Sequence, residues 1–219
     1  MEKIDLTNIG IIKSQASPEL LSIVGAEISK IQSDFSKGVP KNKTLAGNIL
    51  HEYELFDCHD ALEIKTREMA MMHQEEYGKS YTTGLNAHNT LLEKGKIPSL
   101  KLNSVWVNFQ QKGEFNPLHN HTGLYSFVLW YKVPYYENIE ATASPGRRSK
   151  NNLAGKFEFQ YTNILGNITG AQIPVDKQWE GQMLLFPSLL NHQVYPFFSS
   201  NDYRISVSGN LFLGFEGSK

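Results

Sequence analysis

The feature that most constrains this chain is a change of hydrophobic pattern near Leu102. From there onward, short apolar runs alternate with turn-rich segments, which is typical of an all-β barrel or sandwich. In the segment Lys156–Tyr161, aromatic and polar residues alternate, so one strand face is expected in the core and the other in solvent. The expected strands are Leu102–Phe109, Leu124–Val133, Lys156–Asn163, Met183–Phe186, His192–Tyr195 and Tyr203–Leu213.

The first hundred residues carry helical spacing instead, after a short strand expected at Ile9–Ile12. Ser17-Pro18-Glu19 combines a capping hydroxyl, a first-turn proline and an acid beside the positive end of the helix dipole, so a helix should begin there. A second helix is expected from about Asp57 to Tyr77. The apolar stripe of the first helix is Leu20, Leu21, Val24, Ile28, Ile31 and Phe35, and that of the second is Cys58, Leu62, Met69 and Met72.

These patterns predict an α+β, mainly β protein. A chain of 219 residues can bury a sizeable core as one domain. We therefore expect a single domain over residues 1–219, in which a mainly helical half, 1–100, packs on a β core, 101–219.

Charge and cysteine content exclude several classes of partner and site. The 21 basic and 22 acidic residues leave a formal charge of −1, so no nucleic-acid or membrane partner is expected. The single cysteine, Cys58, excludes an intramolecular disulfide and a Cys-rich zinc site, and it fits the core. With no signal peptide and no long apolar run in the sequence, a cytoplasmic location is expected.

Two histidines, His119 and His121, precede a strongly apolar run. On a strand, side chains two apart point to the same face, about 6.6 Å apart along the chain. Two imidazoles on one face can bind one metal ion, although this motif is short and weak by itself.

The last strand carries an informative alternation. Tyr203, Ile205 and Val207 share one face, so Arg204 and Ser206 share the other and should point into the barrel. A buried arginine needs a partner, because an unpaired buried charge costs several kcal/mol. That partner is expected to be a protein carboxylate or an anionic ligand.

Taken together, these segments resemble the 2-oxoglutarate/iron(II)-dependent oxygenases encoded by many tailed phages, relatives of the prolyl-hydroxylase group. The resemblance covers about Leu102 to Leu213, and the helical first half is similar with less distinctive residues. The motifs that carry it are Trp106-Val-Asn108, Gly113, Asn116-Pro117, His119-x-His121, Ser126, Trp130-Tyr131, Gly181 to Ser188, His192-x-Val-x-Pro196 and Arg204-x-Ser206-x-Ser-x-Asn210.

The resemblance implies a double-stranded β-helix, or jelly roll, with a three-residue iron(II) site. In it, His119 takes the first ligand position, His121 the carboxylate position and His192 the distal position. Arg204 takes the position that binds the distal carboxylate of 2-oxoglutarate, with Ser206 beside it. Two further residues, Asn108 and Trp130, are expected to line the cosubstrate pocket.

The sequence departs from the family at one place, because His121 stands where the family has Asp or Glu. Three imidazoles also suit zinc or nickel. Binding of the metal by only one of His119 and His121 stays open as an alternative. Glu114 lies too far along the turn to be assumed as the missing ligand.

The leading hypothesis is an Fe(II)- and 2-oxoglutarate-dependent oxygenase, with ascorbate as an accessory reductant, which hydroxylates a C–H bond of a peptidyl or small-molecule substrate such as proline. The rivals are a non-catalytic metal-binding jelly-roll module of a virion or ligand-binding system, and a cupin-like three-His dioxygenase that does not use 2-oxoglutarate. A phage-encoded enzyme would work in the host cytoplasm. The oligomeric state stays open, with a homodimer among the options.

The remaining features have simpler interpretations. His51, His59, His73 and His88 are expected at the surface or at helix caps. Two polar loops are expected at Ala143–Gly155 and Gly166–Asp176. The first carries the local basic cluster Arg147, Arg148, Lys150 and Lys156, which is expected to be solvated, with a lid over the substrate or a contact to an acidic partner as the functional alternative.

Overall fold

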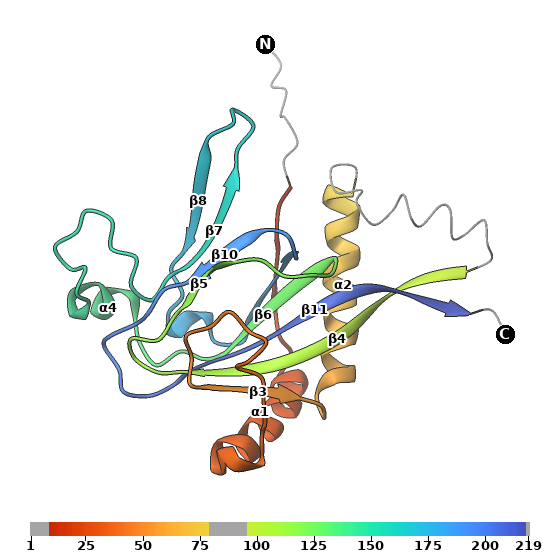
Figure 1. Cartoon of the computed structure of the whole chain (residues 1–219), viewed down its shortest axis with the longest axis horizontal. Coiled ribbons are helices and arrows are strands. Elements are labelled where there is room, and N and C mark those ends of the chain that lie inside the picture. Colours follow the sequence, from red (N-terminus) through yellow and green to blue (C-terminus); the bar gives the residue numbers. More distant parts are fainter. Residues whose placement is uncertain (1–8, 79–95, 218–219) are drawn as a thin grey trace.

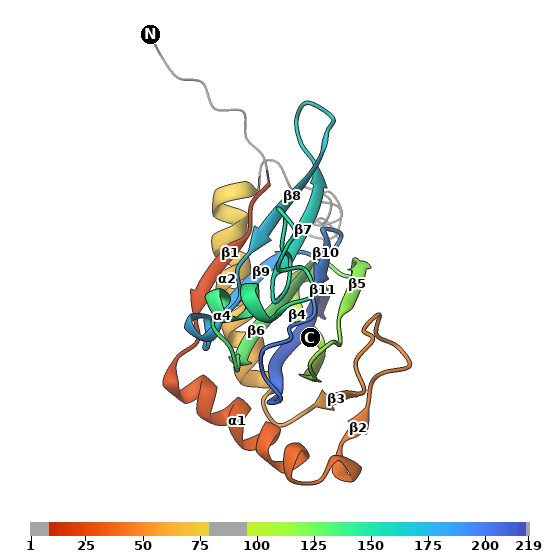
Figure 2. The same cartoon turned by 90° about the vertical axis from the view of Figure 1, so that its left-hand side faces the viewer.

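A computed structural model describes residues 9–78 and 96–217 of the chain. Two antiparallel sheets face each other, and α2 and the smaller sheet lie on opposite sides of the larger sheet (Figures 1 and 2). The larger sheet has the strand order β1-β9-β6-β11-β4-β3-β2 and the smaller has β5-β10-β7-β8. The strands are β1 Ile12–Gln15, β2 Val39–Pro40, β3 His51–Leu55, β4 Lys96–Gln110, β5 Asn116–His119, β6 Tyr125–Lys132, β7 Phe157–Thr162, β8 Ile168–Ile173, β9 Gln182–Pro187, β10 Asn191–Val194 and β11 Arg204–Gly217.

The helices are α1 Pro18–Ser33, α2 His59–Tyr77 and α4 Glu137–Ala143, with short 3₁₀ turns at Phe35–Lys37 and Lys177–Trp179. Their starting signals act as the sequence predicts. At α1 the Ser17 hydroxyl accepts a hydrogen bond from the Leu20 amide at 3.2 Å, and Pro18 occupies the first turn. None of the helices in the described ranges combines the length and apolar content needed to cross a bilayer.

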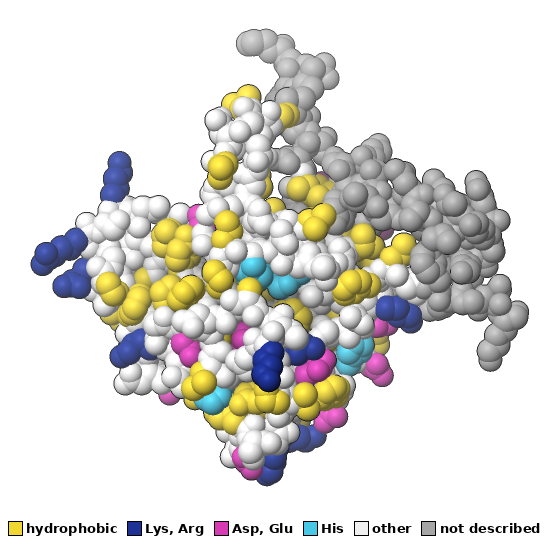
Figure 3. Space-filling model, in the orientation of Figure 1, with side chains coloured by type: hydrophobic (Ala, Val, Ile, Leu, Met, Phe, Trp, Pro, Cys, Tyr) yellow, Lys and Arg dark blue, Asp and Glu magenta, His cyan; other side chains and the backbone are white. Residues whose placement is uncertain are grey.

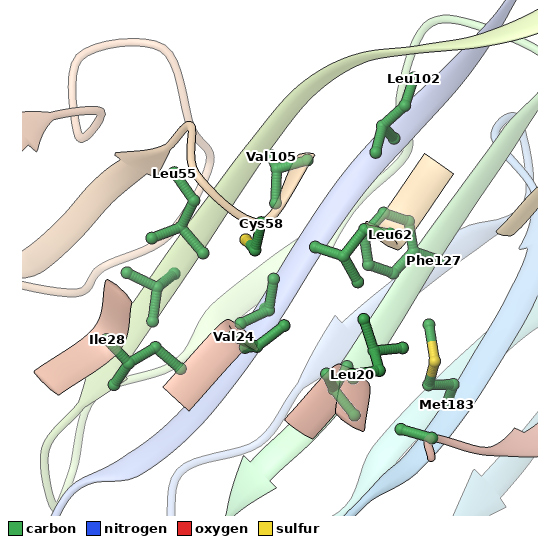
Figure 4. Close-up of a cluster of buried hydrophobic side chains, with 14 of the residues drawn as sticks. Leu20, Val24, Ile28, Leu55, Cys58, Leu62, Leu102, Val105, Phe127 and Met183 are labelled. Atoms are coloured by element: carbon green, nitrogen blue, oxygen red, sulfur yellow. The ribbon is translucent and has the colours of Figure 1, made fainter. Parts of the chain in front are cut away.

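The apolar run of strand β6 is nearly continuous because both faces of the strand are buried. Phe127 and Leu129 belong to the cluster between the larger sheet and the helices, whereas Val128 and Trp130 belong to the cluster between the two sheets. A strand that is buried on both faces needs apolar residues at every position. Figure 4 shows the helix-side cluster, in which Val24, Leu62 and neighbours lie over the sheet, and the fully buried Cys58 is part of it as expected.

The register between β11 and β4 determines which polar side chains share the space between the sheets. Arg204 lies opposite Gln110, Ser206 opposite Asn108, and Ser208 opposite Trp106. The intervening residues Ile205 and Val207 are buried in the helix-side cluster. The predicted direction of the Arg204 face is therefore confirmed.

The predicted fold class is confirmed, but the helical share of the first hundred residues is smaller than expected. Strands β1, β2 and β3 lie there and extend the larger sheet. The strand expected at Ile9–Ile12 begins at Ile12, where its backbone pairs with β9. Short strands of this kind depend on long-range pairing, which local spacing does not report.

Three other expectations are wrong. The loop expected at Gly166–Asp176 contains β8, an edge strand paired with β7. Most of its side chains are exposed, so no apolar alternation identifies it. His73 is fully buried and not at the surface, with Nε2 at 3.0 Å from the Gly10 carbonyl oxygen and Nδ1 at 3.1 Å from the Tyr125 hydroxyl. Met72 is not on the buried face of α2 as expected: that face continues from Met69 to His73, and Met72 is 51% exposed. His88 lies outside the described residues.

The packing of α2 on the sheet can be tested with one truncation. Leu62→Ala removes a side chain with 0% exposure and should lower the free energy of unfolding by about 2–5 kcal/mol. Ile64→Ala on the same helix, at a position 73% exposed, should change it by less than about 0.5 kcal/mol. Urea denaturation of both variants measures the difference, and equal effects would contradict this packing.

Candidate metal and cosubstrate site

Three histidines from two distant parts of the chain meet between the sheets. His119 ends β5 and lies directly opposite His192 of β10 in the antiparallel register. His121 follows β5 by two residues, and its amide donates to the Ser188 carbonyl at 2.8 Å. One ring nitrogen from each of the three histidines lies within 4.8 Å of the other two, which is compatible with a shared metal ion. Histidine side chains reach the surface near the middle of the face in Figure 3.

Backbone carbonyls orient two of these rings. His119 Nδ1 is 2.7 Å from the Pro117 carbonyl oxygen, and His192 Nδ1 is 2.9 Å from the Leu190 carbonyl oxygen. A carbonyl oxygen only accepts hydrogen bonds, so each Nδ1 carries the proton and each Nε2 keeps its lone pair. This is the arrangement by which second-shell groups prepare a histidine for a metal.

The surroundings keep the imidazoles neutral. Burial, and then the neighbouring imidazoles, lowers the pKa of His192 to about 3 and that of His121 to about 4. The rings of Phe157 and Phe186 lie 5.6 and 4.9 Å from the His192 ring. Metal binding requires neutral imidazole, so the three side chains fit a divalent cation at neutral pH.

Arg204 is 2% exposed and lines the same cavity as the histidines. Its guanidinium donates to Gln110 Oε1 at 2.7 and 3.1 Å, to the Tyr135 hydroxyl at 2.5 Å, and to the carbonyls of Gly155 and Tyr195 at 3.1 and 2.9 Å. All these acceptors are neutral, and no carboxylate of the described residues forms an ion pair with Arg204. Neither of the two expected partners is therefore present in the described part of the chain: neutral acceptors take all five guanidinium N–H groups, and a carboxylate that binds Arg204 would have to replace one of them.

The other predicted pocket residues also line this cavity. Asn108 donates through Nδ2 to the Ser206 hydroxyl at 3.3 Å, and its Oδ1 has no hydrogen-bond partner among the described residues. Trp130 is 2% exposed and packs edge-on against Phe157. An unsatisfied buried amide oxygen is costly without a ligand or water to donate to it.

Three residues near the site were not identified from the sequence. Gln110 and Tyr135 hold Arg204, and burial raises the pKa of the Tyr135 hydroxyl. Glu52 of β3 is 1% exposed and lines the cavity. Burial, and then the nearby Glu114 carboxylate, raises its pKa to about 7. No local motif marks these residues, because contacts between segments distant in the chain bring them to the site: Glu52 and Gln110 by strand pairing, and Tyr135 from the segment between β6 and α4.

Two other residue sets lie outside the histidine cluster. Arg147, Arg148 and Lys150 are exposed in the segment that follows α4, and Lys and Arg side chains project at that edge of the molecule in Figure 3. Glu114 accepts hydrogen bonds from the amides of Leu50 and Gln111 at 2.9 and 2.7 Å, and it is not part of the metal-binding set.

One solved structure of a known protein supports this architecture, and two others are less similar. A prolyl-4-hydroxylase from Pseudomonas putida superposes with a TM-score of 0.53 at 13% identity, over 93% of this chain and 92% of that chain. A Trichoplax adhaerens prolyl hydroxylase in complex with a peptide fragment gives 0.47 at 12% identity, over 93% and 84%. A viral collagen prolyl hydroxylase from Paramecium bursaria Chlorella virus-1 gives 0.42 at 12%, over 92% and 94%. The similarity to the Pseudomonas putida structure shows that the fold is the jelly roll. In sequence, no curated protein is similar enough to count as a match.

Residues 104–210 match the family described as "Putative 2OG-Fe(II) oxygenase". This segment runs from β4 to β11 and contains the three histidines and Arg204. The family match defines the class of protein, a 2-oxoglutarate-dependent dioxygenase. Through this segment the chain is similar to the 2OG-Fe(II) oxygenase family, and its cofactors are iron(II) and 2-oxoglutarate. A phage origin stays a prediction.

The buried carboxyl group of Glu52 gives a testable pH dependence of stability. Its pKa is higher in the folded than in the unfolded chain, so stability falls as pH rises from about 4.5 through 7. Glu52→Gln removes this loss, so its gain in unfolding free energy over the parent should grow from near zero at pH 4.5 to roughly 3 kcal/mol at pH 8. Urea denaturation with a chelator present measures it.

The matched control for that experiment is Glu54→Gln on the same strand. Glu54 forms an ion pair with Lys41 at 3.0 Å and is less buried than Glu52. Glu54→Gln should give no gain in unfolding free energy that increases with pH. A pH-independent effect of Glu52→Gln would show that the carboxyl group is not desolvated as described.

Proposed function

We propose that His119, His121 and His192 bind iron(II), that Arg204 binds the distal carboxylate of 2-oxoglutarate, and that the enzyme hydroxylates a C–H bond of a peptidyl or small-molecule substrate. The observation that carries this proposal is that three neutral imidazoles and a guanidinium without a counter-ion line one cavity. The iron and 2-oxoglutarate supply the activation of O2 and the oxidation of the C–H bond.

The protein's own residues prepare this chemistry. The carbonyls of Pro117 and Leu190 hold two Nε2 atoms in their deprotonated form. The aromatic side chains around His192 exclude water from that side of the site. Arg204 is held rigidly by Gln110 and Tyr135, so little side-chain entropy is lost when it binds a carboxylate.

The three-His set has a consequence for charge. With His121 in the family's carboxylate position, the ligands leave both positive charges of the metal uncompensated. Arg204 adds a third charge in the same cavity. A dianionic cosubstrate supplies the missing negative charge, and this supports 2-oxoglutarate binding over a site that uses the metal alone.

The substrate is proposed at the level of its class. Prolyl hydroxylation is the first activity to test, because the Pseudomonas putida structure is described as a prolyl-4-hydroxylase. Asn108, Ser206 and Trp130 are proposed to line the cosubstrate pocket. The cytoplasmic location and the homodimer stay predictions.

A spectroscopic test separates this function from its rivals. Purified protein mixed anaerobically with iron(II), ascorbate and 2-oxoglutarate should show the weak metal-to-ligand charge-transfer band in the visible. His192→Ala should abolish it through loss of the metal, and Arg204→Ala through loss of the cosubstrate. Iron binding that 2-oxoglutarate never perturbs would favour the cupin-like or non-catalytic alternatives.

The ligand assignment has its own test. The double variant His119→Ala/His121→Ala removes two of the three imidazoles and should weaken iron(II) affinity at least about 100-fold, because a single histidine remains. Equilibrium dialysis measures the affinity, with His73→Asn as a control outside the cluster. An unchanged affinity in the double variant would refute the assignment.

A further inference from the structure

Glu52 is a buried carboxyl group without a cationic partner. It is 1% exposed on β3 and lines the cavity that contains the histidines. No Lys or Arg of the described residues forms an ion pair with it, and Lys41, whose amide donates to the Glu52 backbone carbonyl at 2.8 Å, pairs through its ammonium group with Glu54. Among the residues that the structure describes, the one side-chain hydrogen bond to its carboxyl group is a long one, 3.5 Å, from Asn42 Nδ2. Such a group costs stability, so a ligand that pairs with it is its most direct physical explanation.

Acceptor atoms gather around this carboxylate. Asn108 Oδ1 and Asn116 Oδ1 are buried, line the cavity and have no hydrogen-bond partner among the described residues. A Cβ placed on Gly47 would overlap both Asn116 Oδ1 and Glu52 Oε1, so these two oxygens lie close together. The backbone bridge between Asn48 and Phe115 joins the segment before β3 to the residue before β5, and Gly47 of that segment lines the cavity.

The strand register places this acceptor group beside the cosubstrate positions. Glu52 lies opposite Asn108, and Asn108 lies opposite Ser206. Adjacent strands are about 4.8 Å apart, so Glu52 stands two strands, about 10 Å, from Ser206. The cavity therefore has a cationic part at Arg204 and an acidic part at Glu52.

We propose that Glu52, with Asn108 and Asn116, binds a positively charged nitrogen of the substrate, an ammonium or guanidinium group. This inference rests on the proposed function, because it names the substrate class of the same site. A carboxylate and two amide oxygens offer only acceptors, and a cation of this kind offers several N–H donors. A prolyl residue within a peptide has neither a positive charge nor an N–H on its ring nitrogen, so it should bind more weakly.

The test compares probes that differ only in charge. N-acetyl-lysine amide and N-acetyl-norleucine amide share an aliphatic chain, and only the first carries an ammonium group. Binding is followed at pH 8 by the NMR signals of the indole N–H groups. The protein is first loaded anaerobically with iron(II) and 2-oxoglutarate, and the titration is then repeated without metal. Trp106 and Trp130 line the cavity, so their signals should shift. The lysine probe, or its arginine counterpart, should bind at least 10-fold more tightly than norleucine and proline amides.

Variants connect this preference to Glu52. Glu52→Gln should remove the 10-fold preference while the protein stays folded, and Glu54→Gln should keep it. Gly47→Ala adds a methyl group between Glu52 and Asn116 and should weaken lysine-probe binding without loss of the 2-oxoglutarate band.

Three outcomes would overturn the inference. They are equal binding of the lysine and norleucine probes, an unchanged preference for the lysine probe in Glu52→Gln, and loss of that preference in Glu54→Gln as well. Failure of the proposed function looks different. In that case the charge-transfer band is absent, while the metal-free protein still prefers the lysine probe and loses this preference in Glu52→Gln.

Discussion

The antiparallel pairing of β5 with β10 is the interaction on which the rest of the site depends. It places His192 directly opposite His119, although the two residues are far apart in the chain. Register in a strand pair has a period of two, so a shift by one residue would turn one imidazole away from the other. The carbonyls of Pro117 and Leu190, which belong to the same two segments, then orient both rings. The metal-binding geometry is in this sense a property of two short strands held between larger, well-packed elements.

The larger sheet contributes the charges. Arg204 and Glu52 are both almost completely buried, both line the cavity, and neither has an oppositely charged partner in the described part of the chain. Each arrangement costs stability, and the folded core offsets that cost through the apolar clusters on both faces of strands such as β6. Natural proteins violate the rules of burial mainly at functional sites. One cavity thus contains two buried ionisable side chains of opposite sign, which we propose bind an anion and a cation.

Strong local patterns predicted the central elements well, and weak patterns failed for identifiable reasons. The alternation around Arg204 and the capping signal at Ser17 correspond to β11 and α1. The exposed edge strand β8 carries no apolar alternation, so its sequence alone predicts a loop. A single histidine carries no periodicity, so the sequence does not reveal that His73 lies on the buried face of α2.

The sequence by itself determined the class of fold and the chemical types available at the site. Alternation of apolar residues specifies which strand faces are buried. His119, His192 and Arg204 follow a family pattern that can be read without coordinates, and His121 is the one departure from it. Only the tertiary structure decided that the acceptors around Arg204 are neutral and that Glu52 enters the same cavity. The physical reason is that hydrogen-bond partners and burial arise from contacts between strands distant in the chain, and no local spacing encodes those contacts.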